Sequence, residues 1–240
     1  MKNKIILSII PLIIILTMAT LASAQTVNAG VSQNDIFEYN YSATWNSTDP
    51  SATPLINVVE LTQIKSFQIK ITSVSGASVN AEVTKKYQND TTKTVTGFVN
   101  VQSGEIQLQF GTLIIAANRT VNDPIYPSWT NAIINETITR TYQSGDRETN
   151  KRLVEITSAN SYEKTEVYYD KIKGIAVDSY YESRDTNWGQ TEIFTETITN
   201  TNSDVWTVIA ELSTLLVPLT LFVATASLLV AKTAKKRLNR

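Results

Sequence analysis

The chain has 240 residues, of which 42% are hydrophobic, and it carries a formal net charge of −1 with neither cysteine nor histidine. These absences exclude disulfide bonds, zinc sites built from Cys and His, haem ligation by His and every catalytic scheme that depends on a thiol or an imidazole. The charge is unevenly distributed: residues 25–204 hold 21 acidic and 14 basic side chains, whereas residues 232–240 are basic, a pattern that does not indicate a nucleic-acid binder.

Residues 1–24 are predicted to be a secretory signal peptide. Lys2 and Lys4 precede an apolar run over residues 5–18, and the small residues Ala-Ser-Ala follow at 22–24, which is the order of elements in such a signal. We expect cleavage after residue 24. The alternative is an uncleaved anchor, because residues 5–24 are long enough to span a bilayer, although Pro11 disfavours a stable helix there.

Residues 25–204 are predicted to form one extracytoplasmic domain that is mainly β. Apolar and polar residues alternate in segments such as 67–71 (FQIKI), 79–83 (VNAEV) and 106–110 (IQLQF), which is typical of strands with one buried face. Turn residues divide the domain into about ten strands, each of about eight to ten residues. Long consecutive antiparallel strands favour a curved meander or an open half-barrel over a compact sandwich.

One irregular apolar segment interrupts the alternating pattern. Residues 113–117 are continuously apolar, and a proline-containing stretch follows them, so this segment is the candidate for a lid over the concave side of the sheet. We expect it to fill most of the concavity, whereas a remaining gap of several hundred cubic ångströms would favour an apolar ligand. The expected lid or ligand-lining residues are Leu113, Ile114, Ile115, Tyr126 and Trp129.

Five N-x-S/T sequons lie in the predicted domain. Their number is about what the Asn, Ser and Thr content gives by chance, so only their position agrees with export. The candidate glycosylation sites are Asn40, Asn46, Asn89, Asn118 and Asn135.

Carboxylates and tyrosines are the remaining candidates for chemistry. Paired carboxylates can perform acid–base catalysis without histidine, but on strands most of them are expected on solvated faces. Asp123 and Asp146 could bind calcium in turns, yet no calcium-loop motif is present. The tyrosine doublets 168–169 and 180–181 each place one ring on each face of the sheet, either as a platform for a glycan or an apolar ligand or as ordinary sheet surface. The candidate carboxylates are Glu163, Glu166, Asp170, Asp178 and Glu182.

Residues 205–231 are predicted to form a transmembrane helix. The uncharged run over residues 212–231 matches the ~20 residues that cross a bilayer, and the positive-inside rule places the basic tail 232–240 in the cytoplasm. The chain is therefore expected in the cell membrane as a single-pass type I protein. The residues expected at the membrane interface are Trp206, Lys232, Lys235, Lys236 and Arg237.

Four segments together resemble a group of uncharacterised archaeal extracytoplasmic proteins that have a C-terminal membrane anchor. They are residues 113–120 (LIIAANRT), 122–126 (NDPIY), 134–142 (INETITRTY) and 168–174 (YYDKIKG). The Tyr-Asp-Lys-x-x-Gly hairpin in the last of them is also similar to one in lipoprotein-carrier (LolA-like) domains. The first resemblance implies no activity, and the second implies a half-barrel that holds acyl chains.

Taken together, these patterns favour a membrane-anchored cell-surface structural or interaction module without catalytic activity or cofactor. Its expected partners are the lipid bilayer and other surface proteins or glycans, and not nucleic acid. The alternative is a binder of lipid or another apolar ligand in the concave sheet, and a carboxylate-dependent hydrolase is a distant third hypothesis.

Overall fold

The computed structural model describes residues 27–142, 145–187 and 189–202, which belong to one compact unit, Met1–Asp204. The predicted signal peptide 1–24, transmembrane helix 205–231 and basic tail 232–240 lie outside the described residues, and so do the expected membrane-interface residues. In the described part, no helix has the length and apolar character needed to cross a membrane.

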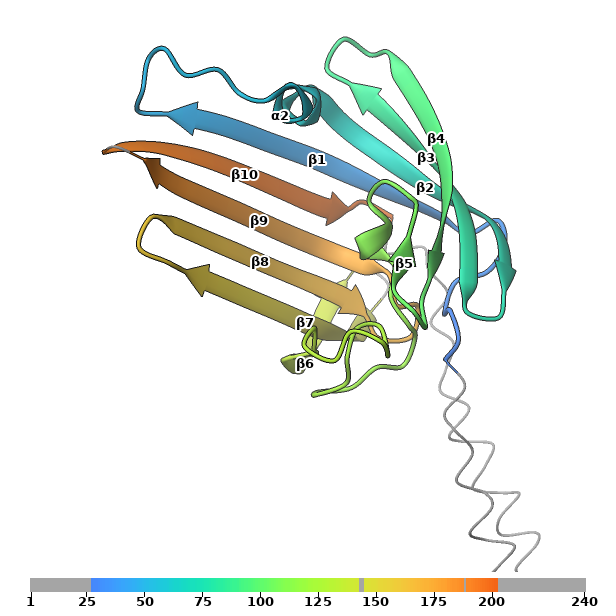
Figure 1. The fold of residues 1–240 in the computed structure, drawn as a ribbon. Coiled ribbons are helices and arrows are strands. Elements are labelled where there is room, and N and C mark those ends of the chain that lie inside the picture. The colour runs from blue at the N-terminus through green and yellow to red at the C-terminus, as the bar shows by residue number, and fades with distance from the viewer. Residues whose placement is uncertain (1–26, 143–144, 188, 203–240) are drawn as a thin grey trace, which may run out of the picture. The chain divides into compact units, whose positions relative to one another are not determined.

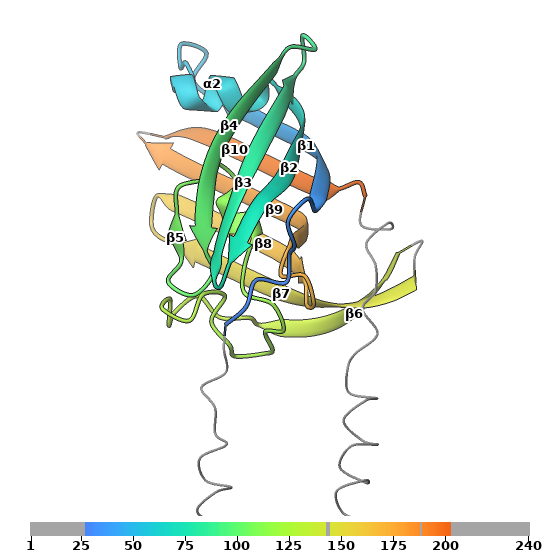
Figure 2. The same ribbon diagram turned by 90° about the vertical axis from the view of Figure 1, so that its right-hand side faces the viewer.

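The described chain folds into a ten-stranded antiparallel sheet, which confirms the prediction of a mainly β meander. The sheet is curved and does not close (Figures 1 and 2), because its edge strands β5 and β6 do not pair with each other. The strands are β1 (Ile36–Ser47), β2 (Ile64–Ser75), β3 (Ser78–Tyr87), β4 (Thr92–Asn100), β5 (Glu105–Ile106), β6 (Glu136–Tyr142), β7 (Gly145–Thr157), β8 (Ser161–Asp170), β9 (Ala176–Asn187) and β10 (Gln190–Asn200). Two short helices join them, α2 (Ile56–Thr62) and the 3₁₀ helix η1 (Gly111–Leu113).

Strand β1 joins two meanders, since the sheet order is β5-β4-β3-β2-β1-β10-β9-β8-β7-β6. It pairs with β10 along nearly its whole length, as far as Ser47 opposite Glu192. Its pairing with β2 ends earlier, at Asn40 opposite Ser66. The sheet therefore splits beyond Asn40, and Figure 1 shows α2 beside this split.

The inner face of the sheet is the face that carries Tyr39, Tyr41 and Phe67, and it holds the core. Alternate residues of β1 are buried here, as the period-two pattern predicts. Phe67 stacks between Tyr39 and Phe110, with ring centroids 4.8 and 4.2 Å apart. Burial of large aromatic rings contributes strongly to stability, so this stack anchors the centre of the sheet.

Residues 106–110 were expected to form a strand, and this prediction is wrong beyond Ile106. The chain leaves the sheet after β5, and Phe110 adopts a left-handed conformation with φ of 59°. This turn directs the Phe110 ring onto Phe67, 4.2 Å away. The apolar residues of the segment therefore face the core from a loop. A loop packed in this way shows the same alternation of apolar and polar residues as a strand.

Residues 107–135, named the plug here, pack against the inner face between the two halves of the sheet (Figure 2). An irregular buried backbone needs partners for its polar groups, and inner-face side chains supply them. The hydroxyl of Tyr169 donates to the Thr112 carbonyl at 3.1 Å, and the Asn150 amide donates to the Arg119 carbonyl at 2.7 Å. The plug is thus a docked part of the core.

The turn between β8 and β9 receives the plug, and its sequence explains the Tyr-Asp-Lys-x-x-Gly hairpin. The Asp170 carboxylate accepts hydrogen bonds from the backbone N–H groups of Ile172 and Lys173 at 3.0 and 2.7 Å. Gly174 has a φ of +64°, and its carbonyl accepts a hydrogen bond of 2.7 Å from the N–H of Ile115 in the plug. Only glycine takes this φ without strain, so the motif builds a docking point.

Candidate functional site

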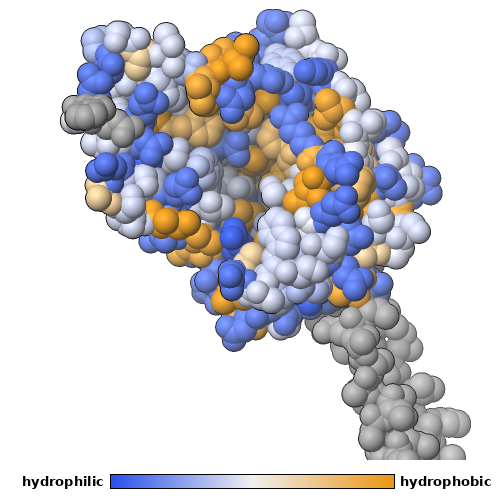
Figure 3. All heavy atoms as spheres, in the orientation of Figure 1, coloured by the Kyte–Doolittle hydropathy of each residue, from blue (hydrophilic) through white to orange (hydrophobic). Residues whose placement is uncertain are grey.

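A groove of about 490 Å³ lies on the inner face beyond the plug. Strands β1, β9 and β10 form its floor, and α2 with the loop before it forms one wall. Figure 3 views this side of the molecule, where hydrophobic surface borders a hollow. The groove residues are Trp45, Thr53, Leu55, Asn57, Val58, Leu61, Tyr181, Ser183, Asp185, Glu192 and Phe194.

The floor of the groove is aromatic because three inner-face positions on neighbouring strands carry rings. Trp45 on β1 pairs in register with Phe194 on β10, which pairs in turn with Ser183 on β9. Tyr181 lies one inner-face position further along β9, and its ring centroid is 6.1 Å from that of Phe194. All three rings are only half-buried, so their faces are available to a ligand.

Helix α2 is an apolar wall that the protein itself leaves uncovered. None of its seven residues is buried. Val58 and Leu61 line the groove, whereas Ile56 is 88% exposed and the preceding Leu55 is 72% exposed. An exposed cluster of large apolar side chains marks a binding surface more often than a free surface.

An ion pair between a buried lysine and a partly exposed glutamate holds α2 to the sheet. The ammonium group of Lys85, on the inner face of β3, lies 2.6 Å from the Glu60 carboxylate of α2, and the Tyr87 hydroxyl donates to the same oxygen at 3.0 Å. The hydrogen bond from Lys85 is the main cause that lowers the pKa of Glu60. Burial alone would lower the pKa of Lys85, but its bonds to Glu60 and Tyr87 outweigh this effect and raise it. Both groups are therefore charged at neutral pH.

A tyrosine–carboxylate pair lies on the inner face next to the groove, where Glu196 is opposite Tyr181 in the register. The Tyr41 hydroxyl donates to Glu196 at 2.6 Å, and the Tyr41 ring centroid lies 5.7 Å from that of Phe110 in the plug. Burial raises the pKa of Glu196, although the hydrogen bond from Tyr41 acts in the opposite direction.

The outer end of the groove carries two exposed carboxylates. Asp185 on β9 and Glu192 on β10 lie directly opposite each other in the register, near the tips of both strands. The groove residues include Ser183 and Asn57 as further polar groups, but neither lysine nor arginine. The groove is therefore apolar along its length and acidic at its mouth.

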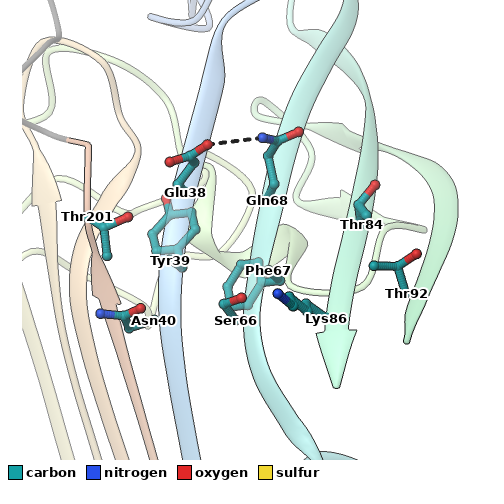
Figure 4. Close-up of a pocket in the computed structure, with 10 residues that line it drawn as sticks. All are labelled: Glu38, Tyr39, Asn40, Ser66, Phe67, Gln68, Thr84, Lys86, Thr92 and Thr201. Carbon is teal, nitrogen blue, oxygen red and sulfur yellow. Dashed lines mark hydrogen bonds between the residues drawn. The ribbon is translucent and has the colours of Figure 1, made fainter. Parts of the chain in front are cut away.

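A second depression, of about 410 Å³, lies on the outer face of β1, β2 and β3 (Figure 4). Its side chains are mostly polar, and several already pair with neighbours: Gln68 donates to Glu38 at 3.2 Å, and Lys86 lies 3.0 Å from Asp90. The rings of Tyr39 and Phe67 point away from it into the core, where both are buried. It therefore has fewer large apolar side chains available to a ligand than the groove.

The predicted lid residues are divided between core and surface. Leu113, Ile114, Ile115 and Tyr126 are buried, and the Tyr126 hydroxyl donates to the Ile114 carbonyl at 2.8 Å. Trp129 is 39% exposed and packs edge-on against Tyr126. None of the five lines the groove, so the structure places them in the plug rather than around a ligand.

All five sequon asparagines are exposed. Asn40 lines the outer-face depression, and Asn46 lies on the same strand. The side-chain oxygen of Asn135 accepts a hydrogen bond from the Leu153 N–H at 2.6 Å, so this amide also helps to position β7. Asn118 belongs to the plug and has a φ of 56°.

Four of the five carboxylates singled out from the sequence form ion pairs. Asp170 is buried against Arg147, at 3.3 Å, and Asp178 lies 2.6 Å from Arg140. Lys151 lies 3.1 Å from Glu166, and Arg184 pairs with Glu182, while Glu163 lies in register opposite Ser183 on the inner face. Within the described ranges, no group of three or more acidic residues is arranged to hold a metal ion.

Comparison with known proteins adds little. No protein-family model matches the sequence, and no curated protein matches it either. The crystal structure of a zebrafish ileal bile acid-binding protein in complex with cholic acid aligns with 70% of this chain and 98% of its own, at 11% sequence identity and a TM-score of 0.21. A similarity this low supports no conclusion about fold or ligand, so the groove has to be interpreted from its own geometry.

Of the groove residues, only Tyr181 was singled out from the sequence, as one ring of the doublet 180–181. Trp45, Tyr181 and Phe194 each sit at an inner-face position of an alternating segment, and that alternation was readable. The sequence pattern does not indicate that β1 pairs with β10. This pairing brings residues from opposite ends of the domain together.

Proposed function

We propose that this protein binds an apolar or amphipathic small molecule in the groove between α2 and strands β1, β9 and β10. We propose further that it does so outside the cytoplasmic membrane, as a domain attached by its C-terminal helix. The observation that carries the proposal is the groove itself: the plug covers only part of the inner face, and the uncovered part is lined by aromatic and aliphatic side chains.

The size and lining of the groove support a small ligand. Its volume of about 490 Å³ lies within the range of ~300–1,000 Å³ that is usual for ligand pockets. A ligand seated against Trp45, Phe194 and Leu61 would remove their exposed apolar surface from water, which stabilises a complex by ~25 cal/mol per Å² buried. An alkyl chain or a flat apolar ring system fits this lining.

One observation favours the hypothesis of a structural or interaction module as a second candidate. The apolar side chains of Leu55, Ile56 and Val59 are exposed, at 72%, 88% and 42%. Another protein could cover this patch instead of a ligand. The two functions can be separated by a change in the groove floor. Such a change should impair ligand binding but not the docking of another protein on the exposed patch.

The test is lipid analysis of the full chain after purification without added lipid. A stoichiometric co-purifying apolar molecule, seen by native mass spectrometry and identified after extraction, is expected for the native protein. Ser183→Phe places a ring on the groove floor and should abolish retention, while Ser42→Phe places the same ring on the exposed outer face of β1 and should not. Equal retention by both variants, or no bound molecule in any of the three proteins, would reject the proposal.

A further inference from the structure

The two charged residues that line the groove are both acidic. Asp185 and Glu192 lie opposite each other at the mouth, and like charges in directly opposed strand positions are destabilising. Neither carboxylate takes part in an ion pair among the described residues. Glu163 on β8 and Glu196 on β10 also lie on the inner face, opposite Ser183 and Tyr181 of the intervening strand β9.

Two basic side chains close to the groove in sequence or on its wall, those of Arg184 and Lys85, have other partners. Arg184 is adjacent to Asp185 but points to the outer face, where it pairs with Glu182 and lies 5.5 Å from the centroid of the Tyr162 ring. Lys85 is held by Glu60. The protein therefore leaves the acidic mouth without a counter-charge from its own described residues.

The carboxylates also act on Tyr181 within the groove. Burial is the main cause that raises the pKa of its phenol, a hydrogen bond with Ser183 lowers it, and the negative charges of Glu163, Asp185 and Glu196 raise it. A site of this polarity repels an anionic head group and attracts a cation.

Aromatic faces next to the carboxylates make the site selective for one kind of cation. The half-buried rings of Trp45, Tyr181 and Phe194 lie within the same groove as the acidic pair. Ring faces attract cations through their quadrupole, and alkylated ammonium groups suit such sites because they are large and weakly hydrated. Carboxylates and aromatic faces together are the chemistry that recognises an ammonium group.

We propose that the ligand is an amphiphile whose polar end is an ammonium cation without a compensating negative charge. The cation lies at the mouth between Asp185 and Glu192 and against the aromatic floor. The apolar part runs along the aromatic floor beside Val58 and Leu61 of α2. This inference rests on the proposed function and adds the class of head group to it.

The experiment uses the full chain in membranes isolated from expressing cells, so that no detergent competes for the groove. Three photoactivatable probes share one alkyl chain that bears a diazirine, and they end in trimethylammonium, hydroxyl or sulfate. Labelling is quantified by mass spectrometry on the peptides that contain Trp45, Tyr181 and Phe194. The trimethylammonium probe should label these peptides roughly five- to ten-fold more than the sulfate probe at equal concentration.

Matched variants separate a specific site from general attraction. The double variant Asp185→Asn/Glu192→Gln should remove most of the preference for trimethylammonium while the hydroxyl probe still labels the groove. The double variant Glu82→Gln/Glu136→Gln removes the same charge away from the groove and should leave the preference unchanged.

The outcomes distinguish the head-group inference from the proposed function. Equal labelling of the groove by all three probes would refute the ammonium inference and leave apolar ligand binding in place. Labelling of the groove by none of them would overturn both. A trimethylammonium preference that survives the Asp185→Asn/Glu192→Gln change would also refute the inference, because the attraction would then come from elsewhere.

Discussion

Replacing Gly174 by alanine would test whether the plug is held on the turn between β8 and β9. Gly174 has a φ of +64°, and a Cβ atom there would lie 2.4 Å from the Ile115 carbonyl oxygen of the plug. The left-handed conformation costs alanine ~1–2 kcal/mol, and forcing a methyl group into a packed contact costs a further ~1–3 kcal/mol. The expected loss in the free energy of unfolding is therefore about 2–5 kcal/mol.

Gly76 provides a matched control, because it has nearly the same backbone conformation without the contact. Its φ is +58°, and a Cβ atom there would have no neighbour within 4 Å. Gly76→Ala should cost only the backbone part, ~1–2 kcal/mol. The difference between the two variants isolates the contact between turn and plug.

The assay is urea unfolding of the fragment 25–204, followed by tryptophan fluorescence and far-ultraviolet circular dichroism. The Gly174→Ala midpoint should fall clearly below that of Gly76→Ala, with similar slopes. Equal destabilisation by the two substitutions would show that the plug does not rest on this turn, and the account of the Tyr-Asp-Lys-x-x-Gly hairpin would fail.

Four further outcomes are expected. A tag after Arg240 should resist protease added to intact cells while a tag at Thr26 is cleaved, and protection of both tags would contradict the proposed topology. The fragment 25–204 should give a β-dominated spectrum and the same melting temperature with or without reductant; a shift with reductant would be inconsistent with a cysteine-free chain. Burial raises the folded-state pKa of Glu196, so its stabilising contribution is present at low pH and lost as the pH rises from about 4 through the raised value. The stability of Glu196→Gln relative to the native protein should therefore increase from pH 4 to pH 7, and a pH-independent difference would contradict this. Glu60→Gln leaves the buried Lys85 ammonium without its carboxylate, so amide exchange in α2 should accelerate by about ten-fold or more, against no change for Glu82→Gln.

The strands could be predicted because alternation is a local signal. In a half-buried strand the polarity of each residue indicates the face on which it lies. Phe67, Ile69 and Ile71 therefore identify both the strand and its buried side without knowledge of the neighbouring strands. The same reasoning gives a wrong prediction at Phe110, because a loop that packs onto the core can place alternate residues inwards as a strand does. Local periodicity therefore predicts burial more securely than it predicts backbone conformation.

Helix α2 was missed for a related reason. Its seven residues span about two turns, which is too short for a helical period to stand out from a neighbouring strand pattern. Leu55, Val58 and Leu61 recur at the helical interval of three, but three residues do not exclude a loop. The buried Lys85 that holds the helix could not be anticipated either, because its partner lies 25 residues away in the sequence.

The groove could not be derived from any one segment, because it exists only where three non-local facts coincide. The pairing of β1 with β10 joins Trp45 to Phe194 across the middle of the sheet. The early end of the pairing between β1 and β2 opens a space that α2 borders, and the plug docks at Gly174 and so leaves that space unfilled. A lid that covered the whole inner face would have made the domain a packed module, but Gly174 lies in the turn at one end of β9 and holds the plug there. The carboxylates that decide the head group lie towards the opposite ends of β9 and β10, where two opposed negative charges do not stabilise the pairing of the strands.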